Sequence, residues 1–445
     1  MSDLGHLRYH VATFGCQMNE NDSEHIAGLL GAAGAAKVER IEDADLAVVN
    51  TCAVREKSEE KLYSYLGRLR ALKKKRGLLI AVAGCVAQTQ REKLLRRNPA
   101  IDIILGPDNY HRLPTILAGL GSETRIWTAR VRKWPEDDLR PVLRESLLSA
   151  YVTIMEGCDR FCAYCIVPFA RGREKCRPLE SILEEVRGLA RAGYREIQFL
   201  GQNVNAYRDP ATGARFDALL RAADSIEGIG WIRFITSHPG NFGLEIAEAM
   251  AGAKRACRQL HLPLQSGSTP VLERMRRGYS RGDFLEKTAM LRGLMPELAL
   301  STDIIVGFPG ETETEFNETL DVLESVRFAN IFSFCYSPRP RTAAARYEDD
   351  IPLEVKRRRL REVQQVQKRI QTEIHQTLIG KTIRVLCTGT SKKDSAILSG
   401  RSEGNQVVNF AAPDDALGRF VQVRITGCGP FSLRGECAGI APRAP

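Results

Sequence analysis

Three cysteines in one short segment are the strongest chemical signal in this chain. Cys158, Cys162 and Cys165, the Cys158 triplet, have the spacing Cys-x3-Cys-x2-Cys within GCDRFCAYCIVPFARGREKCRP. Thiolates hold iron-sulfur clusters, normally four for a cubane, so a triplet leaves one iron without a protein ligand. An open position on a metal can bind a substrate. The alternative is a zinc site, which needs a fourth ligand that Cys176 offers.

Three other cysteines are distant in sequence but occupy equivalent places. Cys16, Cys52 and Cys85, the Cys16 triplet, follow three apolar runs typical of β-strands: YHVATF, LAVVNT and LLIAVAG. The strands of an open parallel sheet point one way, so the loops after their carboxyl ends gather at one edge, where ligands bind. The three thiols are therefore expected to meet, whereas one such cysteine alone is more often a small buried residue.

The elements that must position the Cys16 triplet fill residues 6–122. Apolar runs alternate there with amphipathic stretches, which predicts an open parallel α/β sheet covered by helices. The expected helices span residues 21–33, 54–75, 86–97 and 109–118. Residues 123–145 show little periodicity and contain two prolines, so we interpret them as a linker.

The elements that must position the Cys158 triplet lie in residues 146–376. Six strand-like runs alternate there with helical stretches: YVTIM, EIQFL, WIRFITS, RQLHLPL, LALSTDIIV and NIFSFCY. Six units rather than eight predict an open, partial (β/α)6 barrel with its chemistry at the carboxyl ends of the strands. The expected helices span residues 178–192, 215–225, 243–251, 268–294, 312–325 and 353–378.

A third, basic module is expected at residues 379–442. Short apolar runs separated by Gly, Ser, Asp and Pro predict a small β-barrel. Residues 353–378 hold seven Lys or Arg against three acidic residues, and residues 379–445 hold nine against five, out of a formal charge of +10. This part of the chain therefore indicates a surface for a polyanion such as nucleic acid. The alternative for 353–378 is a solvated basic helix without a partner.

Composition excludes several classes of protein. Hydrophobic residues make up 43% and charged residues 27%, which argues against disorder and collagen-like structure. The longest apolar stretch, LLIAVAGCVA, is about half of the roughly 20 residues that a membrane span needs. The N-terminus lacks a signal-peptide pattern, so a cytoplasmic protein without membrane association is expected. In that compartment clustered cysteines are more often metal ligands or nucleophiles than disulfides.

The chain resembles the methylthiotransferases, radical S-adenosylmethionine (SAM) enzymes with an additional N-terminal iron-sulfur domain. The Cys16 triplet lies in stretches similar to those that hold the family's auxiliary [4Fe-4S] cluster: TFGCQMNENDSE, VVNTCAVREKSEEK and AVAGCVAQ. The Cys158 segment, with LGQNVNAY, HLPLQSGS and STDIIVGFPGETE, resembles the SAM core. The C-terminal barrel resembles the TRAM domain, an RNA-binding module. Cys176 departs from the pattern, because the similar stretch REKSRP usually carries Ser there.

The resemblance implies two [4Fe-4S] clusters and SAM as cofactors. The Cys158 triplet would hold the cluster whose open iron binds SAM, and the Cys16 triplet would hold the auxiliary cluster. Loops after later barrel strands would line the SAM site, although glycines there are also ordinary turn residues. The candidate SAM-binding residues are Gly201, Gln202, Ser237, Gln265 and Gly307. His238 and His261 are candidate ligands or acids, but a lone histidine at a strand end is more often a hydrogen-bonded structural residue. No catalytic residue beyond the cluster ligands is predicted.

Within this family the chain is most similar to the tRNA-2-methylthio-N6-dimethylallyladenosine synthase branch, through Gln17-Met18-Asn19, Arg55-Glu56-Lys57 and GRSEGNQVVNF. That similarity implies transfer of a methylthio group to C2 of N6-isopentenyladenosine at position 37 of tRNA. One SAM would supply the methyl group and another the 5′-deoxyadenosyl radical, because side-chain acid-base chemistry does not activate this C–H bond. The implied partners are the tRNA anticodon loop, a low-potential electron donor such as flavodoxin or ferredoxin, and a sulfur source. The chain is expected to be a monomer.

Two other functions are compatible with these patterns. A methylthiotransferase with another target would act on threonylcarbamoyl-adenosine in tRNA or on an aspartate of a ribosomal protein, although the Gln17-Met18-Asn19 and Arg55-Glu56-Lys57 matches argue against both. A non-catalytic RNA-binding iron-sulfur protein would need only the basic C-terminal part. Truncation before residue 379 is expected to remove the barrel while leaving both triplets and the SAM core intact.

Overall fold

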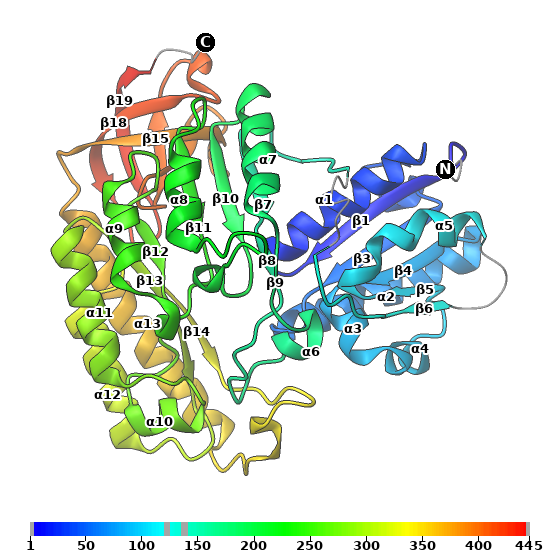
Figure 1. The fold of residues 1–445 in the computed structure, drawn as a ribbon, viewed down its shortest axis with the longest axis horizontal. Coiled ribbons are helices and arrows are strands. Elements are labelled where there is room, and N and C mark those ends of the chain that lie inside the picture. Colours follow the sequence, from blue (N-terminus) through cyan, green and yellow to red (C-terminus); the bar gives the residue numbers. More distant parts are fainter. Residues whose placement is uncertain (1–3, 120–124, 135–140, 442–445) are drawn as a thin grey trace.

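Three modules follow one another in this chain, and the computed structural model describes its residues 4–119, 125–134 and 141–441 (Figure 1). A parallel α/β sheet is followed by an open barrel of parallel strands and then by a small closed β-barrel, which confirms the predicted fold class. The expected domain limits at 122, 123 and 442, and residues 135–140 of the expected linker, lie outside the described residues. No helix in the described part combines the length and the apolar character that crossing a membrane requires.

The N-terminal sheet has six parallel strands in the order β2-β1-β3-β4-β5-β6. The predicted strands are present: β1 (Arg8–Phe14), β3 (Leu46–Thr51), β4 (Leu79–Ala83) and β5 (Ile103–Leu105). Two short edge strands are added, β2 (Ala36–Lys37) and β6 (Arg125–Trp127). Because β6 pairs with β5, part of the expected linker is instead a strand of this sheet.

Helices cover both faces of this sheet. Helix α2 (Glu56–Arg76) lies on one face and α1 (Gln17–Ala32) on the other, and each buries its apolar residues against alternate residues of the strands. The predicted continuous helix at 86–97 is wrong, because Arg91 has a φ of 46°, in the left-handed region that interrupts a helix. The shorter helices are α3 (Cys85–Gln90), α4 (Glu92–Arg97) and α5 (Leu113–Ala118).

All six predicted strands of the open barrel are present and parallel. They are β7 (Ser149–Thr153), β10 (Glu196–Leu200), β11 (Trp231–Phe234), β12 (Gln259–His261), β13 (Ala299–Val306) and β14 (Asn330–Cys335). They form two three-stranded sheets, which meet where Ile232 bridges to Ala256. Within the described residues β7 and β14 do not pair, so the barrel is open between them.

Amphipathic helices cover the outside of the open barrel (Figure 1). The predicted stretch 268–294 is two helices rather than one, because Arg276 and Gly278 adopt φ values of 57° and 69° between them. The helices are α7 (Leu179–Arg191), α8 (Phe216–Asp224), α9 (Leu244–Gly252), α10 (Thr269–Arg274), α11 (Arg281–Leu294) and α12 (Glu313–Val326). Helix α13 (Leu353–Gln376) adds Val363 and Ile370 to the same core.

The C-terminal module is a closed five-stranded barrel, as predicted. Its strands are β15 (Thr382–Thr390), β16 (Leu398–Ser402), β17 (Val407–Ala411), β18 (Phe420–Cys428) and β19 (Leu433–Ile440). Alternate residues such as Val385, Val408 and Val421 fill its interior.

Buried contacts dock this closed barrel onto the open barrel. The rings of Trp231 and Phe420 meet edge to face with centroids 4.8 Å apart. Arg233 donates hydrogen bonds to the carbonyl oxygens of Ser402 and Glu403 at 2.8 and 2.7 Å. Truncation before residue 379 would expose Trp231 and remove these partners from a buried guanidinium. The expectation that truncation leaves the SAM core intact therefore stays a prediction, and point variants test the module better because they keep these contacts.

Candidate functional site

One large cavity joins the three modules. Its volume is about 1810 Å³, and its lining comes from the carboxyl edge of the N-terminal sheet, the mouth of the open barrel and the closed barrel. All six cysteines of the Cys16 and Cys158 triplets line it. Figure 1 shows the N-terminal module beside the open barrel. Helix α3 of the N-terminal module lies there against the segment that follows the Cys158 triplet. The tertiary structure therefore brings two triplets from different modules to one space.

The Cys16 triplet follows the carboxyl ends of β1, β3 and β4. Cys16 immediately precedes the sixteen-residue helix α1, whose dipole favours a thiolate at this end. A hydrogen bond with Cys52 lowers the pKa of Cys16 to about 6, and the nearby Arg171 guanidinium acts in the same direction. Burial raises the pKa of Cys85, the first residue of α3, and Arg171 opposes that shift. Arg171 belongs to the barrel module, so two modules together set the electrostatics of this triplet.

The Cys158 triplet lies on a loop whose base is closed by two short strands. Strand β8 (Met155–Glu156) pairs antiparallel with β9 (Lys175–Cys176). Gly157 opens the loop with a φ of 82°, and a Cβ there would lie 2.0 Å from the Arg173 carbonyl oxygen, so only glycine fits. A short helix, α6 (Val167–Arg171), follows the triplet.

At the barrel mouth Cys158 and Cys162 are buried and Cys165 is half-buried. Burial raises the pKa of Cys158 to about 11 and that of Cys165 to about 12, so a metal that binds them must displace protons at neutral pH. The Arg277 guanidinium donates a hydrogen bond to the Cys162 sulfur at 3.3 Å and another to the Pro263 carbonyl at 2.8 Å. No sequence spacing marks Arg277 as part of the site, and only the fold reveals it.

The donor sets of both triplets fit clusters with one open iron. Among the described residues, no three Cys, His, Asp or Glu side chains are grouped as ligands of one metal ion. Each thiolate of a cubane binds a different iron, so a cluster suits sulfurs that lie farther apart than the ligands of a single ion. Cys176 does not line the cavity; its sulfur accepts a hydrogen bond from the Arg208 amide at 3.5 Å. A zinc site on the Cys158 triplet therefore lacks the fourth ligand that the sequence offered.

Four of the five candidate SAM-binding residues line the cavity, and buried polar atoms without hydrogen-bond partners gather beside them. The four residues are Gly201, Gln202, Ser237 and Gln265. In the described part of the chain, the atoms without partners include Gln202 Nε2, Asn203 Oδ1, Ser237 Oγ and His238 Nε2. Buried polar atoms normally have hydrogen-bond partners, so these four unpartnered atoms together indicate a site for a polar ligand. Its donors and acceptors suit the carboxylate, amino and hydroxyl groups of SAM.

The two histidines at the barrel mouth differ. His261 Nδ1 hydrogen-bonds with Ser301 Oγ at 3.0 Å, as expected of a hydrogen-bonded histidine, but the residue also lines the cavity, so its structural role stays a prediction. In His238, Nδ1 accepts a hydrogen bond from the Gly240 amide at 3.1 Å, but Nε2 has no partner within the described residues. Burial lowers the pKa of His238 to about 2, so the ring is neutral. Its proton therefore resides on Nε2, which makes this atom a hydrogen-bond donor.

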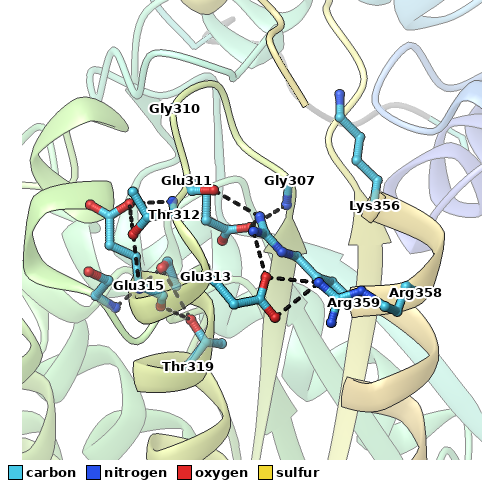
Figure 2. Close-up of polar contacts among 12 residues, drawn as sticks. Gly307, Gly310, Glu311, Thr312, Glu313, Glu315, Thr319, Lys356, Arg358 and Arg359 are labelled. Carbon is cyan, nitrogen blue, oxygen red and sulfur yellow. Dashed lines mark hydrogen bonds and ion pairs between the residues drawn. The ribbon is translucent and has the colours of Figure 1, made fainter. Parts of the chain in front are cut away.

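Gly307, the fifth candidate, does not line the cavity. Its φ is 69°, and a Cβ there would lie 2.4 Å from Lys356 Cγ, so glycine lets α13 pack against this turn. Figure 2 shows the buried Glu311 carboxylate accepting hydrogen bonds from the Gly307 amide at 2.6 Å and from Arg359 at 2.8 Å. This geometry gives Gly307 a packing role in place of the expected contact with SAM.

Much of the positive charge on α13 is neutralised within the chain. Four basic residues of α13 form ion pairs with acidic residues outside the helix: Arg358 with Glu313, Arg359 with Glu311 and Glu313 (Figure 2), Arg369 with Glu324, and Lys356 with Asp349. These pairs lower the charge that the helix offers to a polyanion, but Arg357, Arg361 and Lys368 are exposed, so the polyanion surface and the solvated basic helix both stay predictions. Acidic residues on α12 and in the segments beside it hold α13 to the barrel through these pairs. Arg357 remains on the side of α13 that lines the cavity.

Exposed aromatic and basic side chains also line the cavity. Phe332 and Phe334 on β14 are 44% and 39% exposed, and Phe431, in the turn between β18 and β19, is 75% exposed. A group of large exposed apolar side chains marks a binding surface. Arg357 and Arg401 line the same cavity, and this combination of ring faces with positive charge suits single-stranded nucleic acid.

The stretches that indicated one branch of the methylthiotransferases meet at this cavity. They contribute Gln17 and Met18, the Arg55–Lys57 run and the segment from Gly404 to Val407. Asn19 is buried instead, and its side-chain oxygen accepts a hydrogen bond from the Cys16 amide at 3.4 Å. Stretches from the two ends of the chain therefore face one space.

Family models match three parts of the chain. Residues 8–106 match a family described as "Uncharacterized protein family UPF0004", residues 152–323 match the radical SAM superfamily, and residues 376–438 match the TRAM domain. The matches correspond to the N-terminal sheet, the open barrel and the closed barrel.

Several relatives are similar over nearly the whole chain, and they carry the name tRNA-2-methylthio-N(6)-dimethylallyladenosine synthase. The protein of Acidovorax sp. (strain JS42) is 46% identical over 435 residues, covering 96% of this chain and 96% of that protein. The Geobacter metallireducens protein is 45% identical over 437 residues, covering 98% and 99%. The Acetivibrio thermocellus protein is 44% identical over 437 residues, covering 96% and 90%.

Solved structures share the fold at low identity. The radical SAM methyltransferase TsrM from Kitasatospora setae, with cobalamin and a [4Fe-4S] cluster bound, matches with a TM-score of 0.55 and 16% identity over 90% of this chain and 81% of its own. The cobalamin-dependent radical SAM enzyme OxsB matches with a TM-score of 0.54 and 14% identity over 81% of this chain and 56% of its own. Both likenesses concern the fold alone.

Proposed function

This chain belongs to the family of tRNA-2-methylthio-N(6)-dimethylallyladenosine synthases, and on that premise we propose that it adds a methylthio group to C2 of N6-isopentenyladenosine beside the tRNA anticodon. It is a radical SAM enzyme of tRNA modification, as the resemblance predicted. The observation that carries the proposal is the single cavity lined by both cysteine triplets. Transfer of a sulfur-containing group to an RNA base needs both centres near one substrate.

The residues of the cavity fit the cofactors that the family uses. The Cys158 triplet would hold the [4Fe-4S] cluster that binds SAM, and the Cys16 triplet would hold the auxiliary cluster. When bound, the clusters and SAM supply the electron, the methyl group and the place for the sulfur. Gly201, Gln202, Ser237 and Gln265 would contact SAM, together with Asn203 and His238, because all six line the cavity and four of them have a buried polar atom without a partner among the described residues.

The chain's own side chains orient and shield this site. Arg277 ties Cys162 to the Pro263 carbonyl and so holds the sulfur in one direction at the barrel mouth. The Nε2–H of His238 and the side-chain amide of Gln202 offer donors where water is largely excluded. Hydrogen bonds are stronger in such a site, and reactive species there are protected from side reactions.

The substrate partner is tRNA, in agreement with the TRAM match and the relatives' names. The anticodon loop is single-stranded, so its base can enter the cavity at modest cost while basic side chains hold the backbone. We further propose a low-potential electron donor such as flavodoxin or ferredoxin, because the cluster must be reduced, and a sulfur source, because the product gains a sulfur atom. We also propose a monomeric enzyme with a cytoplasmic location.

The proposed substrate is tested with two anticodon stem-loop RNAs that differ only at N6 of the target adenosine. We expect the isopentenylated RNA to be methylthiolated at least tenfold faster than the unmodified RNA. Burial of even part of five carbons, at about 0.8 kcal/mol per carbon, supplies that discrimination. Mass analysis of the nucleosides measures the product. Equal turnover of both RNAs would contradict the proposed substrate.

RNA binding is tested at the exposed ring of Phe431. Phe431→Ala is expected to weaken binding of the anticodon stem-loop about tenfold, because loss of base stacking on an aromatic ring costs about 1–3 kcal/mol. The matched control is Leu417→Ala, since Leu417 is 53% exposed on the same barrel but does not line the cavity. Fluorescence anisotropy at fixed salt measures both. Equal affinities of the two variants would remove Phe431 from the RNA surface.

The alternatives raised by the sequence are not favoured. The relatives' names specify the dimethylallyladenosine product rather than a threonylcarbamoyl-adenosine or a ribosomal aspartate. A non-catalytic RNA-binding protein would not need two cysteine triplets on one cavity beside a group of unpartnered polar atoms.

A further inference from the structure

Arg171 reaches from one module into another. It ends helix α6 of the barrel module, yet its guanidinium lies among N-terminal residues and is 3% exposed. Its Nη1 donates to Asp22 Oδ1 at 3.2 Å, and its Nη2 pairs with the other oxygen of that carboxylate. Asp22 also accepts a hydrogen bond from the Tyr110 hydroxyl at 3.1 Å. A buried, two-pronged ion pair of this kind holds the arginine in one orientation.

The same guanidinium lies against the Cys16 triplet. It lines the shared cavity together with all three thiols of this triplet, and its positive charge acts to lower the pKa of both Cys85 and Cys16. The helix that carries it packs on α3, with Ala170 and Val86 in one apolar core. Figure 1 shows α6 and α3 beside each other. The short segment between Cys165 and Arg171 therefore connects the two triplets.

We propose that Arg171 is a positioning residue for the auxiliary cluster, a fixed positive charge through which the barrel module stabilises the sulfur centre held by the N-terminal module. The inference rests on the proposed function, since it places that cluster on the Cys16 triplet. It adds a residue that lies outside both triplets and outside the sequence stretch that holds the Cys16 triplet.

The physical basis is charge and hydrogen bonding close to cluster ligands. A guanidinium stays protonated in proteins, so its charge is constant. Positive charge and hydrogen bonds at the ligand sulfurs favour the more negative, reduced state of a cluster and raise its potential. The Asp22 carboxylate acts on Cys85 in the opposite direction, but the charge of Arg171 acts more strongly on that thiol, so Asp22 offsets only part of this effect. The complete environment of the auxiliary cluster therefore exists only when the two modules are docked.

The test measures the potential of the auxiliary cluster alone, in the full chain with the Cys158 triplet replaced by Ala. After anaerobic reconstitution, Arg171→Gln is expected to shift the midpoint potential of the remaining cluster to more negative values. Arg171→Lys should shift it less, because lysine keeps the charge but loses the two-pronged hydrogen bonding. Potentiometric titration followed by electron paramagnetic resonance provides the readout.

The matched control is Lys175→Gln. Lys175 is another buried cation between the same two modules, paired with Asp108 of the N-terminal module and with Glu156 at 2.8 Å. It does not line the cavity, so its loss should leave the potential unchanged. Because Arg171→Gln leaves the Asp22 carboxylate buried without its cation, the double variant Asp22→Asn, Arg171→Gln is measured as well and should keep a negative shift.

In the chain with both triplets intact, Arg171→Gln is expected to reduce methylthio product about tenfold or more, while 5′-deoxyadenosine formation stays within about twofold. An unchanged potential in variants that contain the iron of one cluster would overturn the inference. An equal shift in Lys175→Gln would also overturn it, since module docking would then explain the effect. Absence of any cluster when Arg171 is intact would instead contradict the proposed function, so the two failures are distinguishable.

Discussion

A chain in which Cys158, Cys162 and Cys165 are all replaced by Ala is expected to lose SAM cleavage entirely and half of its iron. These three thiols are the ligands that we assign to one [4Fe-4S] cluster, and without them no open iron remains to bind SAM. Iron should fall from about eight to about four atoms per chain, the content of the remaining [4Fe-4S] cluster. Chromatographic detection of 5′-deoxyadenosine after anaerobic reconstitution measures the first effect, and metal analysis measures the second.

The control for this variant comes from the same segment. Cys176 closes the base of the loop on β9 but does not line the cavity, so Cys176→Ser should retain SAM cleavage and the full iron content. Persistent SAM cleavage in the triple variant would refute the assignment of the radical site to the open barrel. Loss of iron in Cys176→Ser would restore the fourth-ligand interpretation of that residue.

Replacement of Cys16, Cys52 and Cys85 by Ala is expected to separate two activities. SAM cleavage should continue at a similar rate, because its site is built from the other triplet and from loops of the open barrel. The methylthio product should fall below detection, because the auxiliary cluster loses its ligands. Mass analysis of the RNA nucleosides and of 5′-deoxyadenosine from one reaction measures both activities.

Folding must be separated from chemistry in this second variant. Cys52 and Cys85 are buried, and Cys85 shares an apolar core with residues of α6. A parallel variant with Ser at the three positions keeps the approximate volume, and thermal unfolding compares both with the parent chain. Loss of SAM cleavage in the Ser variant, at an unchanged unfolding temperature, would show that the Cys16 triplet supports the radical site itself.

Strands were predictable from the sequence more fully than helices were. The runs of β3 and β4 are buried in a parallel sheet, so most of their residues are apolar and the runs are visible. Barrel strands such as β10 instead alternate apolar with polar residues, which is also a visible pattern. Helix continuity failed where one residue decided it. Arg91 interrupts a stretch of suitable periodicity because its backbone is left-handed, and no side-chain pattern announces that conformation.

The pairing of charges on α13 was not predictable for a related reason. Seven basic residues between 353 and 378 are visible in the sequence, but the acids that neutralise Arg358 and Arg359 lie about 45 residues earlier, on and before α12. A net charge counts residues within a segment, whereas an ion pair depends on which segments pack together. The same limitation applies to Gly307, whose neighbour Lys356 is supplied by that packing.

The chemistry of each cysteine triplet followed from local or repeated patterns. Thiol spacing in one loop, and the position of one thiol after each of three parallel strands, are properties of short segments and of strand direction. The tertiary structure supplied the rest: the fold of the open barrel places Arg277 against Cys162, and the docking of the modules creates one cavity for both triplets and places Arg171 beside the Cys16 triplet. These contacts join residues that are far apart in the chain. They form because whole surfaces pack together, so no local period or spacing in the sequence predicts them.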